Sequence, residues 1–570
     1  MTLVREHDWA APTRADAVLF ELKACAFRMR RLWRDALAGP ERLPQADAAS
    51  FACVVASSRT PLWAEVPPAE RALQRGKVQN LRVAARRLDG TLLESAAVFS
   101  FWKQLGRASR ARGFARGRML REGCIVPATG GGLCQLSNAL YDVALKAGCA
   151  IVERHAHSRR VPGSLAALGR DATVAWNYVD LRFASDGPLL LRVRLDARDL
   201  IVELLARNRT AAHERDIAAG VDTLRDAASC ESCDETSCFR HGAAASEGHR
   251  AFLVDEFWPE FDAYIGTNKR SGDRILLPLD GKRWRRPQYG WNTDGFAAVR
   301  TATFATLARA ASMRGTEQGP KRRNLELRTA QTLARRFAAM LGADATELCV
   351  TQTLLPYLWR DGHLGGRKFS VLMTRLPMAQ LQARLDAAAR RHPERKTLAD
   401  FRADPALLRA ESEALAAAQT VVTPHGDVAA LFGERAVLLD WKTPPARLRH
   451  APLSHRIAFP GPTIARKGAF ELREAARALD LEVVLLGSDL EGADFWHGVR
   501  TTRDTDGLAA FVQPALIEDK PRRLLAALAS GIPVIATREC GLPPQEGLTL
   551  VPAGDVDALI DALRAAISRH

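Results

Sequence analysis

The sequence predicts a multidomain protein in which an α+β module precedes an α/β region built from two domains. A chain of 570 residues is too long for one ordinary hydrophobic core. The first part combines a helical pattern with strands of alternating polarity. After residue 250, short apolar strands alternate with helical stretches. The expected regions are 1–50 (a basic amphipathic helix), 51–210 (the α+β module), 211–250 (a Cys-rich linker), 251–450 and 451–570 (the two α/β domains).

The composition indicates a globular protein with an excess of positive charge. Hydrophobic residues make up 47% and charged residues 26% of the chain, and the net charge is +16. Such a charge favours binding to nucleic acid, anionic membranes or phosphorylated ligands. No nucleic-acid recognition motif accompanies it, so we expect no nucleic-acid partner. No apolar run is long enough to span a membrane, the N-terminus shows no secretory pattern, and the ten cysteines form no disulfide framework. We therefore expect a cytoplasmic location, with peripheral membrane contact left open.

Residues 14–37 are predicted to form one helix. Its apolar positions fall on one side, and the arginines within it make it basic. We expect the apolar side to pack on the next domain, and a helix lying on a membrane surface is the alternative. The apolar positions are Val18, Leu19, Leu22, Ala26, Met29 and Leu32.

A glycine run that ends on a cysteine is the most informative motif of the chain. Residues 130–135 read Gly-Gly-Gly-Leu-Cys-Gln, and the apolar residues that follow recur at helical spacing until Gly148. This pattern places Cys134 in the first turn of a helix. Free N–H groups and the positive end of the helix dipole stabilise a thiolate there, which lowers the pKa of the thiol.

The residues after this helix supply partners for the thiol. His157 is the candidate base, Asp171 is the candidate group that orients it, and His155 is a competing base. With Cys134 as nucleophile, the reaction class is acyl transfer or amide hydrolysis. Two alternatives stay open, namely that these four residues bind a metal ion or that they have a binding or structural role.

Short strands are expected around this site. Residues 151–152 and 174–176 are predicted to be strands, and residues 189–193 and 200–204 to form a hairpin. Arg154 and Arg170 flank the site, and their charge is suited to holding a carboxylate such as a peptide terminus.

The stretch from residue 80 to residue 203 resembles the VanW family, named for an accessory protein of vancomycin-resistance clusters. The resemblance implies that the α+β module is a VanW-like domain and that the ligands are glycans or peptidoglycan precursors of the cell envelope. It is carried by Asn80-Leu81, Asp89-Gly90, Phe99-Ser100-Phe101, Gly123, residues 130–135, Leu140-Tyr141, Glu153-Arg154, His157-Ser158, residues 169–174 and Asp180-Leu181.

The linker contains four soft metal ligands within twelve residues. Cys230, Cys233, Cys238 and His241 could surround one tetrahedral zinc ion as a compact structural site. An iron–sulfur cluster on the three cysteines, or thiols that are reduced or paired in disulfides, are the alternatives.

The last 110 residues resemble the nucleotide-sugar-binding half of GT-B glycosyltransferases. The similar stretches are 466–468, 484–487 and 517–536. The resemblance implies two Rossmann-like domains and a nucleotide sugar as donor substrate, with Arg466 and Lys467 at its diphosphate and Glu518 near the sugar or nucleotide. One position departs from the pattern: Ala526 stands where many retaining enzymes carry a second glutamate.

Two functions therefore compete at the level of the whole chain. In the first, the protein transfers a sugar from a nucleotide donor to an envelope acceptor, and the thiol acts on acyl or peptide groups. In the second, it binds a glycan or a peptidoglycan precursor without turning it over. His425 follows a predicted strand at a position where α/β folds place ligands, and a structural role is the alternative for it.

Overall fold

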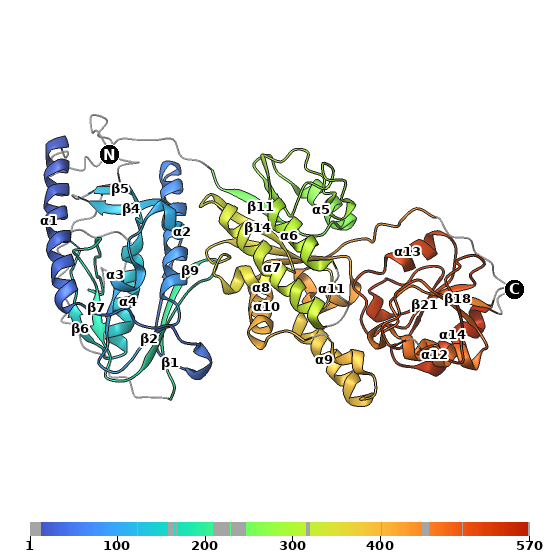
Figure 1. Ribbon diagram of the computed structural model, residues 1–570. Helices are drawn as coiled ribbons and strands as arrows, with labels where there is room; N and C mark the ends of the chain where they lie inside the picture. The colour runs from blue at the N-terminus through green and yellow to red at the C-terminus, as the bar shows by residue number, and fades with distance from the viewer. Residues whose placement is uncertain are drawn as a thin grey trace. The chain divides into compact units, whose positions relative to one another are not determined.

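The computed structural model describes residues 13–121, 124–157, 165, 169–208, 228–229, 247–314, 320–400, 402–446, 455–492 and 494–567. Two compact units can be distinguished in it. The first comprises residues 1–249 together with 341–347 and 361–368, and the second comprises the rest of the chain (Figure 1). Across the part of the chain that the structure describes, no helix is both long enough and apolar enough to cross a bilayer.

The first unit is an α+β assembly of helices and mainly antiparallel strands. Its largest sheet has the strand order β1-β9-β8-β2, and two smaller sheets have the orders β3-β7-β6 and β10-β5-β4. The helices are α1 (Arg14–Ala38), α2 (Arg71–Leu88), α3 (Phe101–Leu105) and α4 (Leu133–Lys146). The strands are β1 (Cys53–Pro61), β2 (Thr91–Leu93), β3 (Val98–Ser100), β4 (Arg116–Arg121), β5 (Cys124–Thr129), β6 (Ala150–Glu153), β7 (Arg182–Ala184), β8 (Leu189–Leu195), β9 (Asp199–Ala206) and β10 (Ala228–Ser229).

The core of this unit lies where α2 and α4 meet the largest sheet. The apolar stripe predicted for α4 is confirmed, because Leu136, Leu140, Val143 and Ala144 are fully buried in this core. The predicted hairpin is confirmed as well, since β8 and β9 pair antiparallel and contribute alternate leucines and valines to the same core. The sheet therefore holds α4, and with it Cys134, in a fixed position.

Two local predictions for this unit are wrong. Residues 174–176 form no strand: only an isolated bridge joins Ala175 to Val179. Helix α1 forms over the predicted residues, but its apolar side does not pack on the domain. Val18 and Leu22 are 60% and 64% exposed, whereas Arg31 is buried. The helix packs through polar residues, which hydrophobic periodicity cannot reveal.

The second unit contains two parallel sheets. The first has the strand order β13-β12-β11-β14-β15-β16-β17. Its strands are β11 (His249–Leu253), β12 (Arg274–Leu277), β13 (Ala298–Thr301), β14 (Ala345–Thr351), β15 (Lys368–Leu372), β16 (Thr420–Thr423) and β17 (Ala436–Leu438). Its helices are α5 (Pro259–Asn268), α6 (Thr303–Met313), α7 (Pro320–Met340), α8 (Leu355–Arg360), α9 (Met378–Arg391), α10 (Pro405–Ala417) and α11 (Gly426–Phe432).

The second sheet has the order β20-β19-β18-β21-β22-β23, and every neighbouring pair is parallel. Its strands are β18 (Arg456–Phe459), β19 (Glu482–Leu485), β20 (Arg500–Thr502), β21 (Ala510–Gln513), β22 (Val534–Thr537) and β23 (Leu548–Val551). Its helices are α12 (Ala469–Ala478), α13 (Arg522–Ala529) and α14 (Val556–Ile567).

Alternate residues of these strands enter different cores, so both faces of the second sheet are covered. Ile457 and Phe459 belong to one buried cluster, whereas Ala458 between them belongs to another. Continuous apolar strands of this kind are typical of parallel sheets with helices on both sides.

The order of the strands identifies the fold of the second unit. In each sheet the first strand of the sequence lies in the interior, and the second and third strands are added next to it on one side. The fourth strand then lies on the other side of the first, and the later strands follow it in order, which is the Rossmann arrangement. Two such domains in succession make the GT-B-like architecture. The predicted fold class, an α+β module followed by a two-domain α/β region, is therefore confirmed.

Candidate functional sites

The three glycines before α4 have separate structural roles. Gly130 and Gly132 adopt φ angles of 82° and 96°, which side chains other than hydrogen disfavour. Gly131 has an ordinary φ, but a Cβ there would lie 2.3 Å from the carbonyl oxygen of Gly117 on β4. The loop therefore lies directly against the backbone of β4, and α4 begins at a defined point with Cys134 in its first turn.

Asn80 on α2 holds this loop in place. Its side chain is fully buried, and its Nδ2 donates hydrogen bonds to the carbonyl oxygens of Gly131 (2.8 Å) and Ala115 (3.1 Å). Its Oδ1 accepts a hydrogen bond from the N–H of Ala115 (2.8 Å). In the sequence, Asn80 stands out only through the family resemblance. No local pattern shows that its side chain forms a hydrogen bond with Gly131, 51 positions further along the chain.

Cys134, His157 and Asp171 converge beside the start of α4. Asp171 Oδ2 lies 3.0 Å from Nδ1 of His157 and also accepts the main-chain N–H of His157 at 2.7 Å. The thiol of Cys134 lies close enough to the His157 ring for a hydrogen bond to shift the pKa of both groups, and its sulfur also lies 3.9 Å from Thr173 Oγ1 and 4.0 Å from the carbonyl oxygen of Val174. Because Nδ1 faces the carboxylate, Nε2 is the nitrogen left for the sulfur. The order of groups is thus sulfur, imidazole, carboxylate.

The charges of these groups support one another. Burial raises the pKa of the Cys134 thiol, but the hydrogen bond and the charge of His157 outweigh it, and the net pKa is lowered. Burial lowers the pKa of His157, but Asp171 and Cys134 raise it to about 9. The bonds from His157 hold the pKa of Asp171 down at about 2, against the effect of burial. The thiolate and the imidazolium therefore stabilise each other.

A second layer of residues fixes the carboxylate. Arg154 Nη2 donates to Asp171 Oδ1 at 2.6 Å, and Arg154 Nε donates to the carbonyl oxygen of Asp171 at 2.7 Å. On α4, Asn138 Oδ1 accepts the N–H of Ala172 at 2.8 Å. The cysteine helix thus also anchors the segment that carries Asp171, a coupling that the sequence did not reveal.

Another set of charged residues gathers in the second unit, at the carboxyl edge of its second sheet. Lys467 follows β18 and Glu518 follows β21, and these two strands are neighbours at the point where the strand order reverses. Lys467 Nζ lies 3.0 Å from Glu518 Oε2 and donates to the carbonyl oxygen of Ile517 at 3.0 Å. Arg466 adjoins this pair, and its carbonyl oxygen accepts the N–H of Ile517. Open α/β sheets bind their ligands in this crevice.

The corresponding edge of the first sheet carries a carboxyl group with an altered pKa. Asp255 follows β11 and accepts a hydrogen bond from Thr353, which follows the neighbouring strand β14. Burial raises the pKa of Asp255 despite that bond. The next residue, Glu256, pairs at 2.6 Å with Lys520, close in sequence to Glu518. No local pattern in the sequence points to Asp255, since its partner lies almost a hundred residues away.

His425 links the two Rossmann domains. It is 2% exposed, and its Nε2 donates to the carbonyl oxygen of Glu518 at 3.0 Å. A Cβ at position 541 would lie 2.4 Å from the His425 ring, so Gly541 makes room for it. This geometry favours the structural alternative for His425.

Comparison with known proteins shows what part of the first unit resembles. The family described as "VanW like protein" matches residues 76–205. The protein YoaR of Bacillus subtilis is 31% identical over 132 residues, covering 23% of this chain and 43% of YoaR. The vancomycin B-type resistance protein VanW of Enterococcus faecalis is 31% identical over 144 residues, covering 24% of this chain and 52% of that protein. Residues 76–205 are therefore similar to the VanW family, and we call them the VanW-like domain.

The chain spans about half the length of these curated relatives. Among solved structures, the lipopolysaccharide outer core galactosyltransferase WaaB is similar at 12% identity and a TM-score of 0.32, covering 56% of this chain and 90% of WaaB. A score this low adds nothing to the fold assignment, which depends on the strand order in the two parallel sheets.

The geometry bears on three residues that flank the site. His155 lies in a loop after β6, and its half-exposed ring faces Glu153 at 3.2 Å, while His157 faces Cys134. Arg154 is bonded to Asp171, and Arg170 pairs with Asp142 at 2.5 Å. Both arginines therefore have internal partners, which argues against their predicted role as a clamp for a substrate carboxylate.

The metal predictions have no structural support. Cys230, Cys233, Cys238 and His241 lie outside the described residues, so their arrangement is not known. Within the described ranges, no group of three or more His, Cys, Asp and Glu residues is arranged to hold a metal ion. The alternative that His155, His157, Asp171 and Cys134 form a metal site is accordingly set aside.

Proposed function

We propose that the VanW-like domain is a thiol-dependent enzyme of acyl transfer or amide hydrolysis. The observation that carries this proposal is the convergence of Cys134, His157 and Asp171, with the sulfur and the carboxylate on different nitrogens of one imidazole. A positioned base that is itself oriented by a carboxylate is the arrangement that activates a nucleophile.

The residues fit a two-step reaction. The Cys134 thiolate attacks the carbonyl carbon, the bond to the leaving amine or alkoxide breaks, and His157 gives its Nε2 proton to the leaving group. Water or another acceptor then attacks the thioester and gives a proton to His157, and the thiolate departs. The N–H groups in the first turn of α4 are suited to stabilise the negative oxygen that forms in each step. Asp171 keeps the imidazole in the required orientation.

Envelope precursors are the proposed substrate class. This proposal comes from the resistance to vancomycin named for the relative in Enterococcus faecalis and from the resemblance to GT-B transferases in the same chain. A peptide bond or an acyl ester of a glycan or peptidoglycan precursor would supply the carbonyl group on which Cys134 acts.

Acylation by p-nitrophenyl acetate tests the thiol proposal. The full chain with Cys25→Ser and Cys53→Ser is the background, because these are an exposed and a half-buried cysteine outside the site. We expect a burst of p-nitrophenolate equal to the protein concentration and one acetyl group on Cys134, located by mass spectrometry of peptides. Cys134→Ser should abolish the burst, and His157→Gln should slow it. An acetyl group that never appears on Cys134, or a burst unchanged in His157→Gln, refutes the proposal.

A specific observation favours a second activity in the other unit. We propose that the two Rossmann domains transfer a sugar from a nucleoside diphosphate sugar to an envelope or glycan acceptor. The position of Lys467 and Glu518 at the reversal of the strand order supports a donor site there. Lys467 and Arg466 are suited to the diphosphate and Glu518 to donor hydroxyl groups. Asp255, with its raised pKa, is suited to accept the proton of the acceptor hydroxyl.

Thermal shift with UDP-glucose and GDP-mannose tests the donor site. Binding should stabilise the second unit by roughly 3 kcal/mol at a hundred times the dissociation constant. Lys467→Ala should remove the shift, and Lys282→Ala, a change at an exposed lysine, should leave it intact. Asp255→Asn should stop transfer without affecting binding. No shift with either nucleotide sugar refutes this donor site, and binding without any transfer supports the non-catalytic alternative.

A further inference from the structure

Helix α1 packs on the VanW-like domain through its polar side. Arg31 is 5% exposed, and its Nη1 donates to Glu153 Oε2 at 2.7 Å. Arg182 Nη2 donates to Asp35 Oδ2 at 2.6 Å. Ala24, seven residues before Arg31 and therefore on the same side of the helix, is buried. Turning the helix would leave buried charges without partners, which is costly, so its orientation is fixed.

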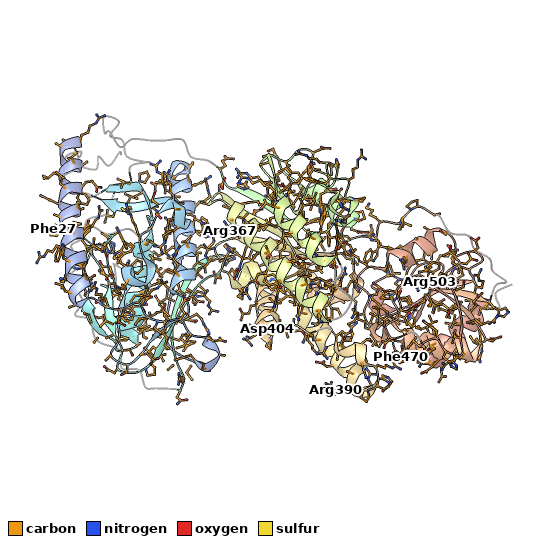
Figure 2. All side chains as sticks on the ribbon, viewed as in Figure 1. Phe27, Arg367, Arg390, Asp404, Phe470 and Arg503 are labelled. Atoms are coloured by element: carbon orange, nitrogen blue, oxygen red, sulfur yellow. The ribbon has the colours of Figure 1, made fainter. Side chains whose placement is uncertain are left out.

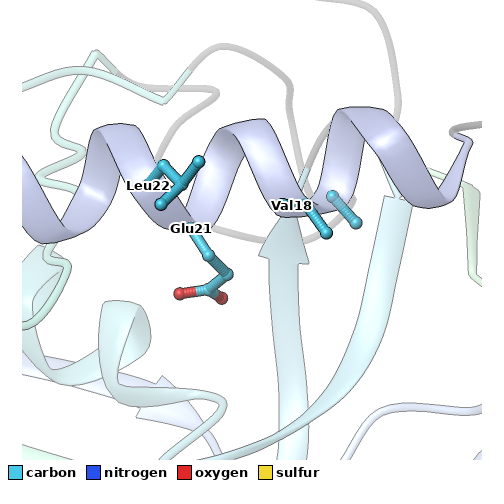
Figure 3. A pocket seen from close by; sticks show the side chains of 4 residues that line it. Val18, Glu21 and Leu22 are labelled. Atoms are coloured by element: carbon cyan, nitrogen blue, oxygen red, sulfur yellow. The ribbon is translucent and has the colours of Figure 1, made fainter.

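The opposite side of α1 is apolar and faces outward. At 100° per residue, its exposed apolar residues fall within one arc of about 140°, apart from Phe27, which stacks on Tyr178. Figure 2 shows side chains along the length of α1, and Figure 3 shows Val18 and Leu22 beside Glu21 at a shallow hollow on the helix. The residues of this outer apolar face, all at least 50% exposed, are Val18, Leu19, Leu22, Met29, Leu32, Trp33 and Leu37.

A row of basic residues borders the outer apolar face. Lys23, Arg30 and Arg34 are exposed and follow one edge of the arc, seven and four residues apart. Two acidic residues, Glu21 and Asp35, lie beyond the other edge, where Glu21 pairs with Arg28 of the same helix and Asp35 with Arg182 of β7. Positive charge is therefore concentrated beside the apolar stripe.

We propose that the outer apolar face of α1 binds the surface of an anionic lipid bilayer, with the helix axis parallel to the membrane. An apolar stripe with basic residues along its border matches both layers of such a surface, the acyl chains and the negative headgroups. The helix of 25 residues is about 37 Å long and would lie on the bilayer, because it does not have the composition to cross it. Symmetric pairing with a second copy would bring two basic rows together, which disfavours a dimer through this face.

Flotation of the full chain with vesicles tests this proposal. We expect binding to vesicles that contain phosphatidylglycerol and little binding to phosphatidylcholine alone, and we expect binding to weaken as salt is added. Lys23→Gln, Arg30→Gln and Arg34→Gln together should weaken the partition roughly a hundredfold, since each basic residue near an anionic surface contributes about fivefold. Leu22→Glu with Trp33→Glu should abolish binding.

Phe304→Glu is the matched control, because Phe304 is an 89% exposed aromatic residue on α6 in the other unit. Circular dichroism, together with the alkylation rate of Cys134, should show that all variants remain folded. Vesicle binding that survives Leu22→Glu with Trp33→Glu, or that is lost equally in Phe304→Glu, overturns the proposal. A lack of any vesicle binding also overturns it. A dimer in sedimentation that the same double variant dissociates would do so as well, because a second copy would then be the partner of this face.

Discussion

Replacing Asp171 by Asn removes the negative charge that orients His157 while keeping the size of the side chain. Asp171 accepts hydrogen bonds from both Nδ1 and the main-chain N–H of His157. Without the charge, the imidazolium is less stable, and the Cys134 thiolate loses the cation that supports it. We therefore expect Cys134 to be protonated over a wider range of pH and to react more slowly with alkylating agents.

The size of the effect follows from the pKa of His157. Its rise from 6.5 to about 9 corresponds to about 3.4 kcal/mol of preference for the charged ring. The hydrogen bond from Asp171 is the largest single contribution that raises this pKa, so we assign Asp171 about 2 kcal/mol. Losing this support should lower the rate of Cys134 alkylation by up to roughly thirtyfold near pH 8, where His157 is charged in wild type and largely neutral in the variant. At pH 6, where the ring is charged in both proteins, and at pH 10, where it is largely neutral in both, the two rates should converge.

The assay measures iodoacetamide modification of the Cys134 peptide by mass spectrometry between pH 5 and pH 10. Asp142→Asn is the matched control, because Asp142 is another buried aspartate of the same domain and is paired with Arg170 instead of His157. It should change stability but leave the rate at pH 8 as it is. Equal rates at pH 8 in Asp171→Asn and wild type would refute the role assigned to the carboxylate.

Three other changes give clear expectations. Gly131→Ala should lower the free energy of unfolding in urea by about 2 kcal/mol, because the new Cβ would meet a main-chain oxygen. Gly187→Ala is the control: its Cβ would lie in open space, so its free energy of unfolding should stay within about 0.5 kcal/mol of wild type. Equal losses in both would contradict the packing argument. Glu260→Gln should destabilise the second unit by about 3 kcal/mol, since it leaves the charge of Arg522 without its buried partner, and an unchanged melting curve would contradict this. Ala526→Glu should tighten UDP binding in calorimetry roughly tenfold by adding an acceptor for ribose hydroxyls, and unchanged affinity would exclude that contact.

Features that depend on short stretches of sequence could be predicted. The apolar spacing after Cys134 and the stop at Gly148 define a helix whose start carries the thiol, and α4 confirms it. The alternation of strands and helices after residue 250 similarly predicts parallel sheets, which the strand order confirms. In both cases the signal is local, because the pattern of burial repeats with the period of the element.

Features that depend on pairing between distant residues could not be predicted. Helix α1 faces the domain with Arg31 because Glu153 lies there, 122 residues further along the chain, and this ion pair overrides the hydrophobic periodicity. The sequence predicts Arg154 as a ligand for a substrate carboxylate, but its partner in the structure is Asp171 of the same site. His155 and His157 are equivalent in the sequence, and only the folded loop shows which ring reaches the thiol.

The central claim is that Cys134 is held as a thiolate by His157. The most direct measurement is the ultraviolet absorbance of the thiolate during a pH titration, taken as the difference between the wild-type chain and Cys134→Ser. We expect the midpoint to lie below the value of about 8.5 that is usual for a cysteine thiol, and to move upward in His157→Gln. A midpoint at or above the usual value, or one that His157→Gln leaves unchanged, would contradict the account.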